Sequence, residues 1–321
     1  MDGLQGVALG LTAALAWGLT DTVATFASRR VGSLRTTAGT VLVSVAVLAL
    51  LFVAGDATLP EDPGVVLTAL ACGAIAAWAY LAFYTALRHG PITVVSPVVA
   101  TYGGLTVVLS VLLLGEAPSA GQALGVVVAT TGIVLASVAF EGGLRGARPV
   151  GPGVAYAIVA LVGFAALTVV LAGPIRAAGW LPVLLLSRSA NAVVVLMILG
   201  SLRLRRPPAP GPASTSPGAT GSGRAPMAVP TPPAPIPASS RPIDRRAVAL
   251  LVTAGLLDVA GFISFALGLE IAPTWLIGIT SSFGPVIAVI AGVALLGERP
   301  RPVQWFGLGL VLASVFLITL G

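Results

Sequence analysis

The sequence is poor in the residues on which soluble proteins and disulfide scaffolds depend. It contains one cysteine, Cys72, and one histidine, and all seventeen basic residues are arginines, so lysine is absent. Charged residues make up 9% of the chain, against about 25% in a typical soluble domain. A water-facing surface needs more charge than this, and a disulfide framework needs more than one cysteine. The composition therefore excludes a soluble globular protein and a disulfide-stapled one.

Patterns typical of enzymes and metal sites are also missing. The sequence has no HExxH, no GxSxG and no P-loop, which are the motifs of common hydrolases and nucleotide-binding proteins. One histidine and one cysteine are too few for a zinc site. The net charge of +6 would suit nucleic acid, but the arginines are scattered over short loops without interleaved aromatics. We expect no enzyme, no metal, no cofactor and no nucleic-acid partner.

Long apolar stretches are what the chain has instead. Hydrophobic residues make up 57% of the sequence, and about 20 consecutive apolar residues suffice to cross roughly 30 Å of hydrocarbon. In lipid the backbone must satisfy its own hydrogen bonds, so we expect all-α structure. Ten spans are predicted, at 4–27, 36–54, 64–87, 91–114, 120–140, 152–173, 180–200, 247–269, 273–296 and 302–320.

One segment between the seventh and eighth spans differs in kind. From Ser201 to Arg246 the chain is rich in Pro, Ala, Ser, Gly and Arg, and it holds twelve of the 25 prolines. Such a composition cannot bury enough apolar surface to offset its ordering entropy. We predict a disordered loop at about 201–246, acting either as a tether or as a segment that binds a partner.

An internal repeat divides the chain into two parts. At a constant shift of 182 residues, Phe83 aligns with Phe265 and Pro91 with Pro273. The turn motif LLGExP also occurs in both parts. Because five spans is an odd number, the second half, at 150–321, must be inverted relative to the first, at 1–140. The repeated turn residues, expected to be structural, are Gly115, Glu116, Pro118, Gly297, Glu298 and Pro300.

These repeated segments resemble a known domain. The stretch from Tyr84 to Gly132 and its counterpart from Gly268 to Ser314 are similar to the EamA domain of the drug/metabolite transporter superfamily, and Trp17-Gly18 looks like the WG signature of that family. At the equivalent place in the second half we expect Val162-Gly163. The resemblance implies a ten-helix secondary transporter, often an exporter of small metabolites or amino acids.

Two charges are expected in the middle of the bilayer. Asp258 is central in its span, and Arg188 is at a matching depth in the preceding span. Charges at this depth are costly and need a reason. They either bind opposite ends of a zwitterionic solute, with Asp258 as candidate site for a coupling proton or Na⁺, or form a structural ion pair. Asn191 shares a helix face with Arg188.

Discontinuous helices are a second marker of a transport site. Pro285 cannot donate to the carbonyl of Ser281, which leaves that oxygen free. Hydroxyls and aromatic rings surround this point and its repeat mate, although ordinary helix packing would explain each of them singly. The candidate cavity residues are Trp17, Tyr80, Tyr84, Thr101, Tyr102, Arg188, Asn191, Asp258, Phe262, Ser281, Ser282 and Pro285.

The remaining acidic residues are expected to be structural. Glu116 and Glu298 lie in turns, where they would cap the next helix or pair with loop arginines, and Asp21 is expected near the membrane interface. The odd-numbered loops hold fifteen arginines and the even-numbered ones only Arg176. The positive-inside rule then places both termini outside the cytoplasm. Ten-helix members of the family are usually drawn with both termini inside, and the two readings stay open.

The sequence thus predicts a multi-pass protein of a bacterial plasma membrane, because the arginine, alanine, glycine and valine bias is typical of a GC-rich bacterial genome. Its predicted function is alternating-access transport of a small organic metabolite or amino-acid-like solute, in contact with membrane lipid, as a monomer or homodimer. The alternative is a non-transporting membrane scaffold or assembly subunit that acts through the 201–246 loop.

Overall fold

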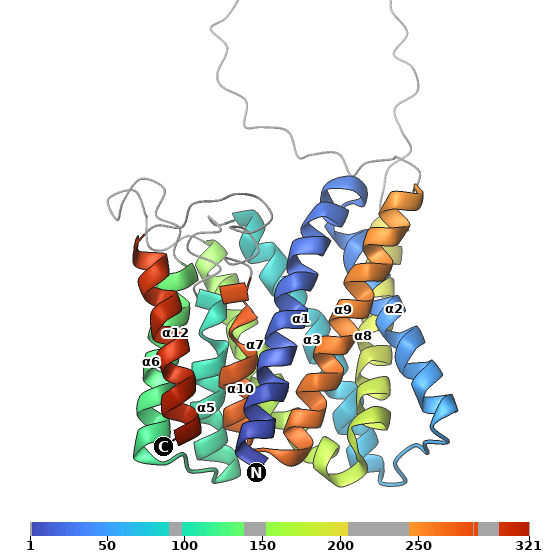
Figure 1. Ribbon diagram of the computed structural model, residues 1–321. Coiled ribbons are helices and arrows are strands. Elements are labelled where there is room, and N and C mark those ends of the chain that lie inside the picture. Colours follow the sequence, from blue (N-terminus) through green and yellow to red (C-terminus); the bar gives the residue numbers. More distant parts are fainter. Residues whose placement is uncertain are drawn as a thin grey trace, which may run out of the picture.

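The computed structural model (Figure 1) describes residues 2–89, 98–137, 152–204, 244–284, 286–287 and 302–320. Within these ranges all regular structure is helical, and seven helices are long and apolar enough to cross a membrane. The helices are α1 (Asp2–Val31), α2 (Ser33–Ala54), α3 (Pro63–His89), α5 (Tyr102–Leu114), α6 (Ala120–Ser137), α7 (Pro152–Ala178), α8 (Trp180–Leu204), α9 (Arg245–Ile271), α10 (Thr274–Ser281) and α12 (Pro302–Leu320).

The described helices coincide with the predicted apolar stretches and are mostly longer than them. Helices α5, α6 and α10 are shorter, because parts of the fourth, fifth and ninth predicted spans lie outside the described residues. The count of ten spans remains a prediction. Residues 205–243 of the predicted loop also lie outside. Helix α9 begins directly after Asp244, whose side chain caps it by accepting a hydrogen bond from the Ala247 N–H at 2.8 Å.

Short turns with glycine join several of the helices. Gly115 and Gly179 have φ angles of 67° and 81°, a left-handed conformation that disfavours residues with a Cβ. Gly179 is all that separates α7 from α8. After Gly115 the chain starts α6 with reciprocal bonds between Ser119 and Gln122: each backbone N–H donates to the other side chain, at 3.0 and 3.1 Å.

The helices pack in pairs that repeat between the two halves. Helix α1 packs on α9 as α7 packs on α3, and α2 packs on α9 as α8 packs on α3. Two further pairs, α2 with α8 and α6 with α12, join helices that are equivalent in the two halves, and α5 of the fourth predicted span packs on α10 of the equivalent ninth span. This pattern is that of a pseudo-two-fold axis passing through those three pairs.

Two close helix contacts follow the same symmetry. A Cβ on Gly73 of α3 would lie 2.0 Å from the Ser187 carbonyl oxygen on α8. A Cβ on Gly255 of α9 would lie 2.5 Å from the Val43 Cβ on α2. Gly73 and Gly255 are related by the repeat shift of 182 residues. The two halves therefore use a glycine at the same place for the same close approach.

Helices α1 and α7 begin the two halves and run in opposite directions. Gly6, near the start of α1, lies against Ala272, and a Cβ there would be 2.6 Å from the Ala272 Cβ. Arg176, near the end of α7, donates to the Ala272 carbonyl oxygen at 3.0 Å. The start of α1 and the end of α7 are thus at one face of the molecule, which we call the N-terminal face; both chain termini lie there in Figure 1.

Two of the helices are interrupted at equivalent positions. In the first half the helical residues 98–100 are followed by a turn at Thr101 before α5 begins. In the second half α10 ends at Ser281 and a turn follows at residues 282–283. Thr101 and Phe283 are related by the shift of 182 residues. Both interruptions thus lie at the contact of α5 with α10, close to the two-fold axis.

Large apolar side chains cover much of the outer surface. On α12, Trp305, Phe306 and Phe316 are more than half exposed, as is Trp78 on α3. Water would not tolerate so many exposed apolar side chains, whereas lipid accommodates them. The protein is a multi-pass membrane protein.

Candidate functional site

A buried ion pair joins α8 and α9. The Arg188 Nη2 donates to the Asp258 Oδ2, and the exposed fractions of the two residues are 3% and 7%. Asp258 is fourteen residues from Asp244 and fourteen from Ala272, which places it midway along α9. Arg188 also donates from Nε to the Ser44 Oγ at 3.3 Å, and its guanidinium lies 4.1 Å from the ring centre of Phe262. These contacts offset the cost of removing two charges from water.

An aromatic cluster lies beside the ion pair. The Trp17 ring centre is 5.1 Å from that of Phe262, with an interplanar angle of 69°, and 5.5 Å from that of Phe265. The indole fits because position 261 is a glycine, whose Cβ would lie 2.5 Å from the Trp17 Nε1. This Nε1 is buried and has no hydrogen-bond partner among the described residues.

A second aromatic cluster is the two-fold mate of the first. The Phe164 ring centre is 5.1 Å from that of Tyr80, with an interplanar angle of 71°, and 6.5 Å from that of Phe83. Tyr80 and Phe83 are the repeat mates of Phe262 and Phe265. Phe164 thus occupies the place of Trp17, not Val162 as the sequence suggested.

The shift in residue number that relates α1 to α7 is two residues larger than the sequence motif implied. It follows from the close contacts of α2 and α8, where Thr40 and Val43 correspond to Ser187 and Ala190. Their shift of 147 residues also relates Trp17 to Phe164. The shift of 147 residues that relates α2 to α8 also relates α1 to α7, and applying it to Trp17 identifies Phe164 from the sequence alone.

The charged pair has no counterpart in the first half. The mates of Arg188 and Asp258 are Val41 and Ala76, both apolar and buried. The mate of Asn191 is Ser44, the acceptor of the Arg188 Nε–H. Asn191 is 1% exposed, and its Nδ2 has no partner among the described residues. The centre thus contains two buried donors, Asn191 Nδ2 and Trp17 Nε1, that lack an acceptor within the described chain.

Asp21 belongs with these central groups more than with the membrane interface. It lies within electrostatic range of both Asp258 and Tyr102, although its own side chain is exposed. The sequence reading assigned it to the interface from its distance to Arg29 and Arg30 along the helix. In the structure α1 extends to Val31, so that Asp21 lies ten residues before the end of the helix.

The hydroxyl groups around the helix interruptions bond mainly to their own helices. Thr101 donates to the Val98 carbonyl at 2.7 Å and Ser282 to the Ile279 carbonyl at 2.7 Å. The Tyr102 hydroxyl and the Ser281 Oγ are 3.3 Å apart and link α5 to α10. Of the other candidates, the Tyr84 side chain and Pro285 lie outside the described residues.

At the N-terminal face, Glu116 contacts the other half of the molecule instead of capping α6. Its Oε1 accepts from the Thr274 N–H at 2.9 Å and its Oε2 from the Trp275 N–H at 3.0 Å, so it caps α10. Arg176 donates to the Glu116 Oε1 at 3.1 Å. It also donates to the Leu269 carbonyl oxygen at 3.1 Å. The second copy of the turn, with Gly297, Glu298 and Pro300, lies outside the described residues.

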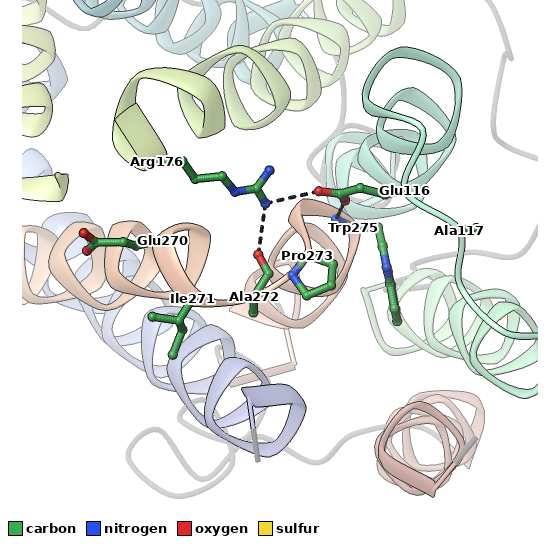
Figure 2. A pocket seen from close by; sticks show the side chains of 8 residues that line it. All are labelled: Glu116, Ala117, Arg176, Glu270, Ile271, Ala272, Pro273 and Trp275. Atoms are coloured by element: carbon green, nitrogen blue, oxygen red, sulfur yellow. Dashed lines mark hydrogen bonds and ion pairs between the residues drawn. The ribbon is translucent and has the colours of Figure 1, made fainter. Parts of the chain in front are cut away.

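Figure 2 shows Glu116, Arg176 and Trp275 around a depression at the N-terminal face. The depression has a volume of about 390 Å³ and is open to the outside; Glu116, Arg176, Glu270, Pro273 and Trp275 are among its lining residues. None of the candidate cavity residues lines it. In the described part of the chain no group of three His, Cys, Asp or Glu side chains could hold a metal ion.

Comparisons with known proteins agree with this architecture. A crystal structure described only as that of a protein superposes with a TM-score of 0.74 at 20% sequence identity, over 98% of this chain and 96% of that chain. It shows the fold alone. No curated protein sequence matches the chain. The sequence model of the EamA-like transporter family matches residues 4–138 and 223–320. These two matches cover more than half of the chain. One lies in each half, and the second includes α9, α10 and α12 but not α7 or α8. The protein belongs to the EamA-like transporter family.

Proposed function

We propose that this protein is a secondary transporter that moves a small organic metabolite or amino-acid-like solute by alternating access, with ten membrane spans and with the Arg188–Asp258 centre as its binding site. The observation that carries the proposal is the buried ion pair midway along α9, beside two buried donors that have no acceptor within the described chain. An unpaired buried donor costs about 1–3 kcal/mol. An acceptor group on a bound solute would remove that cost.

The arrangement suits a solute that carries a carboxylate and an ammonium group. The carboxylate would compete with Asp258 for Arg188 and accept from Asn191, while the ammonium would pair with the released Asp258 carboxylate. Phe262 and Trp17 would pack against the apolar part of the solute. Asp258 is also our candidate site for a coupling proton or Na⁺, because a carboxylate that loses its arginine partner in a buried site must gain another cation.

The proposed direction is export across a bacterial plasma membrane. The support for export is the family membership, and the support for a bacterial membrane is the arginine-rich, lysine-free composition. Alternating access is supported by the inverted halves, related by a two-fold axis close to the α5–α10 contact, because exchanging the conformations of the two halves would give a second, oppositely facing state.

The test is solute flux in proteoliposomes that contain the purified full-length chain. Vesicles are loaded with a panel of amino acids and small metabolites, and efflux is followed with and without pH and Na⁺ gradients. We expect at least one solute to move faster than in empty liposomes and Asp258→Asn to abolish its gradient-driven flux. Glu270→Gln is the matched control, since Glu270 is an exposed carboxylate on the same helix. No flux of any solute would refute the transport proposal, and full activity of Asp258→Asn would refute the coupling role.

A further inference from the structure

Three polar side chains lie on the face of α5 that packs on α10. Tyr102, Thr106 and Ser110 recur every four residues and therefore share one face of α5. On α10, Gly278 lies against Thr106, where a Cβ would be 2.4 Å from the Thr106 Cγ2. We call this contact, from Tyr102 and Ser281 at its inner end to Ser110 at its outer end, the seam. It joins the first half of the molecule to the second.

Ser110 has a buried hydroxyl group that helix packing alone does not explain. It is fully buried, and its hydroxyl has no hydrogen-bond partner among the described residues. Its carbonyl oxygen accepts from the backbone N–H groups of Gly115 and Glu116, which ties it to the turn at the N-terminal face. In a membrane protein a buried hydroxyl without a partner is unfavourable unless water or a solute reaches it. A conformation that admitted water or a solute to Ser110 would satisfy this hydroxyl.

The outer end of the seam is closed by Glu116. Its carboxylate binds the Thr274 and Trp275 N–H groups at the start of α10 and pairs with Arg176 of α7. Arg176 in turn holds the carbonyls of Leu269 and Ala272 at the end of α9. These contacts, which we call the latch, form one wall of the open depression in Figure 2. Outside the latch lies that depression, and inside it lies the buried seam.

We propose that Glu116 and Arg176 gate the seam, so that release of the Glu116 carboxylate from α10 opens a polar path from the N-terminal face to Tyr102 and Ser281. In the latch Glu116 comes from the first half, and its partners on α7 and α10 come from the second. A rocking motion of one half against the other must therefore break these bonds. The use of the path by a solute rests on the proposed transport function, whereas the control of access is a property of the latch itself.

The experiment measures how fast a small thiol reagent reaches the seam. Ser110→Cys is made in a Cys72→Ala background, which removes the one native cysteine. The full-length chain in proteoliposomes reacts with a membrane-impermeant sulfonate methanethiosulfonate. We compare native Glu116 with Glu116→Gln and Glu116→Ala. Both replacements should raise the labelling rate by about tenfold or more, because one charge-assisted hydrogen bond corresponds to at least that shift in an opening equilibrium.

Two controls separate a gate from general loosening. Ser314→Cys tests a fully buried hydroxyl on α12, which donates to the Val311 carbonyl in the same helix, away from the seam. Its labelling should stay slow in every background. Glu270→Gln removes an exposed carboxylate at the same depression and should leave the Ser110→Cys rate unchanged. The gate is overturned if neither Glu116 variant speeds labelling in the seam, or if labelling at position 314 rises equally.

Amide hydrogen exchange provides a second readout without cysteine substitutions. Peptides that cover residues 274–282 should exchange faster in Glu116→Gln than in the parent, and unchanged exchange there also counts against the gate. The two proposals fail separately. Flux of a solute without any effect of Glu116 replacement leaves transport standing and removes the gate. Faster labelling in a chain that moves no solute leaves the gate and removes transport.

Discussion

Trp17 and Phe164 hold equivalent positions in the two halves of the molecule. Each ring meets an aromatic ring of the neighbouring half edge-on, with 5.1 Å between ring centres in both cases. Their partners, Phe262 and Tyr80, are themselves repeat mates. The aromatic lining of the centre thus follows the two-fold axis even though the residue types differ.

This equivalence predicts similar stability losses at the two positions. Trp17→Leu and Phe164→Leu should each lower the free energy of unfolding by about 0.5–1.5 kcal/mol beyond the loss of buried area, because edge-to-face ring contacts disappear in both. Denaturant titration in detergent micelles measures this. Trp78→Leu is the control, since Trp78 is mostly exposed and should change little. A large loss at Trp17 with none at Phe164 would contradict the equivalence.

The stability losses caused by replacing Arg188 and Asp258 should be strongly non-additive. Arg188→Met or Asp258→Leu alone leaves one buried charge without its partner and should cost about 3–5 kcal/mol of unfolding free energy. The double variant removes both charges and should recover most of that loss. A double-mutant cycle measured by denaturant titration gives the coupling energy. Additive losses would mean that the two charges do not depend on each other.

The surface provides the comparison for this cycle. Arg30 and Asp244 form an ion pair at 3.5 Å whose side chains are 46% and 59% exposed. Screening by solvent should keep the coupling energy of this pair below about 1 kcal/mol. Flux assays on the Arg188 and Asp258 double variant add a further readout. If the pair only stabilises the fold, the stable double variant transports normally, whereas a binding site is lost with its charges.

The glycines of the close helix contacts should tolerate no side chain. Gly73→Ala and Gly255→Ala should each cost about 1–3 kcal/mol, because the new methyl group overlaps Ser187 or Val43 on the facing helix. Gly309→Ala, on α12, meets nothing within 4 Å and should stabilise the helix by roughly 0.5–1 kcal/mol. Thermal unfolding in detergent ranks the stabilities of the three variants. Equal stability of all three would refute the packing argument.

The charge distribution predicts the orientation in the membrane. The face opposite the N-terminal face carries four arginines at helix ends: Arg30, Arg35, Arg245 and Arg246. On the N-terminal face, Arg176 is paired with Glu116. The positive-inside rule then places both termini outside the cytoplasm. A green fluorescent protein fused to the C-terminus should be dark and an alkaline phosphatase fusion active. The reverse pattern would agree with the orientation in which ten-helix family members are usually drawn.

Local features of the sequence were sufficient for the helices and the repeat. Apolar runs, turn residues such as Gly115 and the shift of 182 residues all depend on residues close together in the chain, or on a simple comparison of the chain with itself. They predicted the helical membrane fold and the family resemblance that the comparisons confirm. The matching depth of Arg188 and Asp258 in the membrane could be predicted for the same reason, since the two residues are on consecutive helices.

Contacts between distant segments were beyond that reasoning. Glu116 was expected to cap the following helix or to pair with a loop arginine. It does pair with Arg176, but the helix that it caps is α10, which begins 158 residues further along the chain. No local pattern links Ser44 to Arg188, because only the packing of α2 on α8 brings the two side chains together. Phe164 was missed because a two-residue motif fixed the alignment of α7 incorrectly. In each case the missing information was which helix faces which.

The unequal distribution of charge over two otherwise matched halves has a kinetic consequence. Val41 and Ala76 stand where a second arginine and aspartate would complete the symmetry. Exchanging the conformations of the two halves therefore does not restore an identical environment for a molecule held at the middle. Under the proposed alternating access, entry from one compartment and entry from the other cross barriers of different height. The solute would then load faster from one side, while its distribution at equilibrium would be set by the gradients alone.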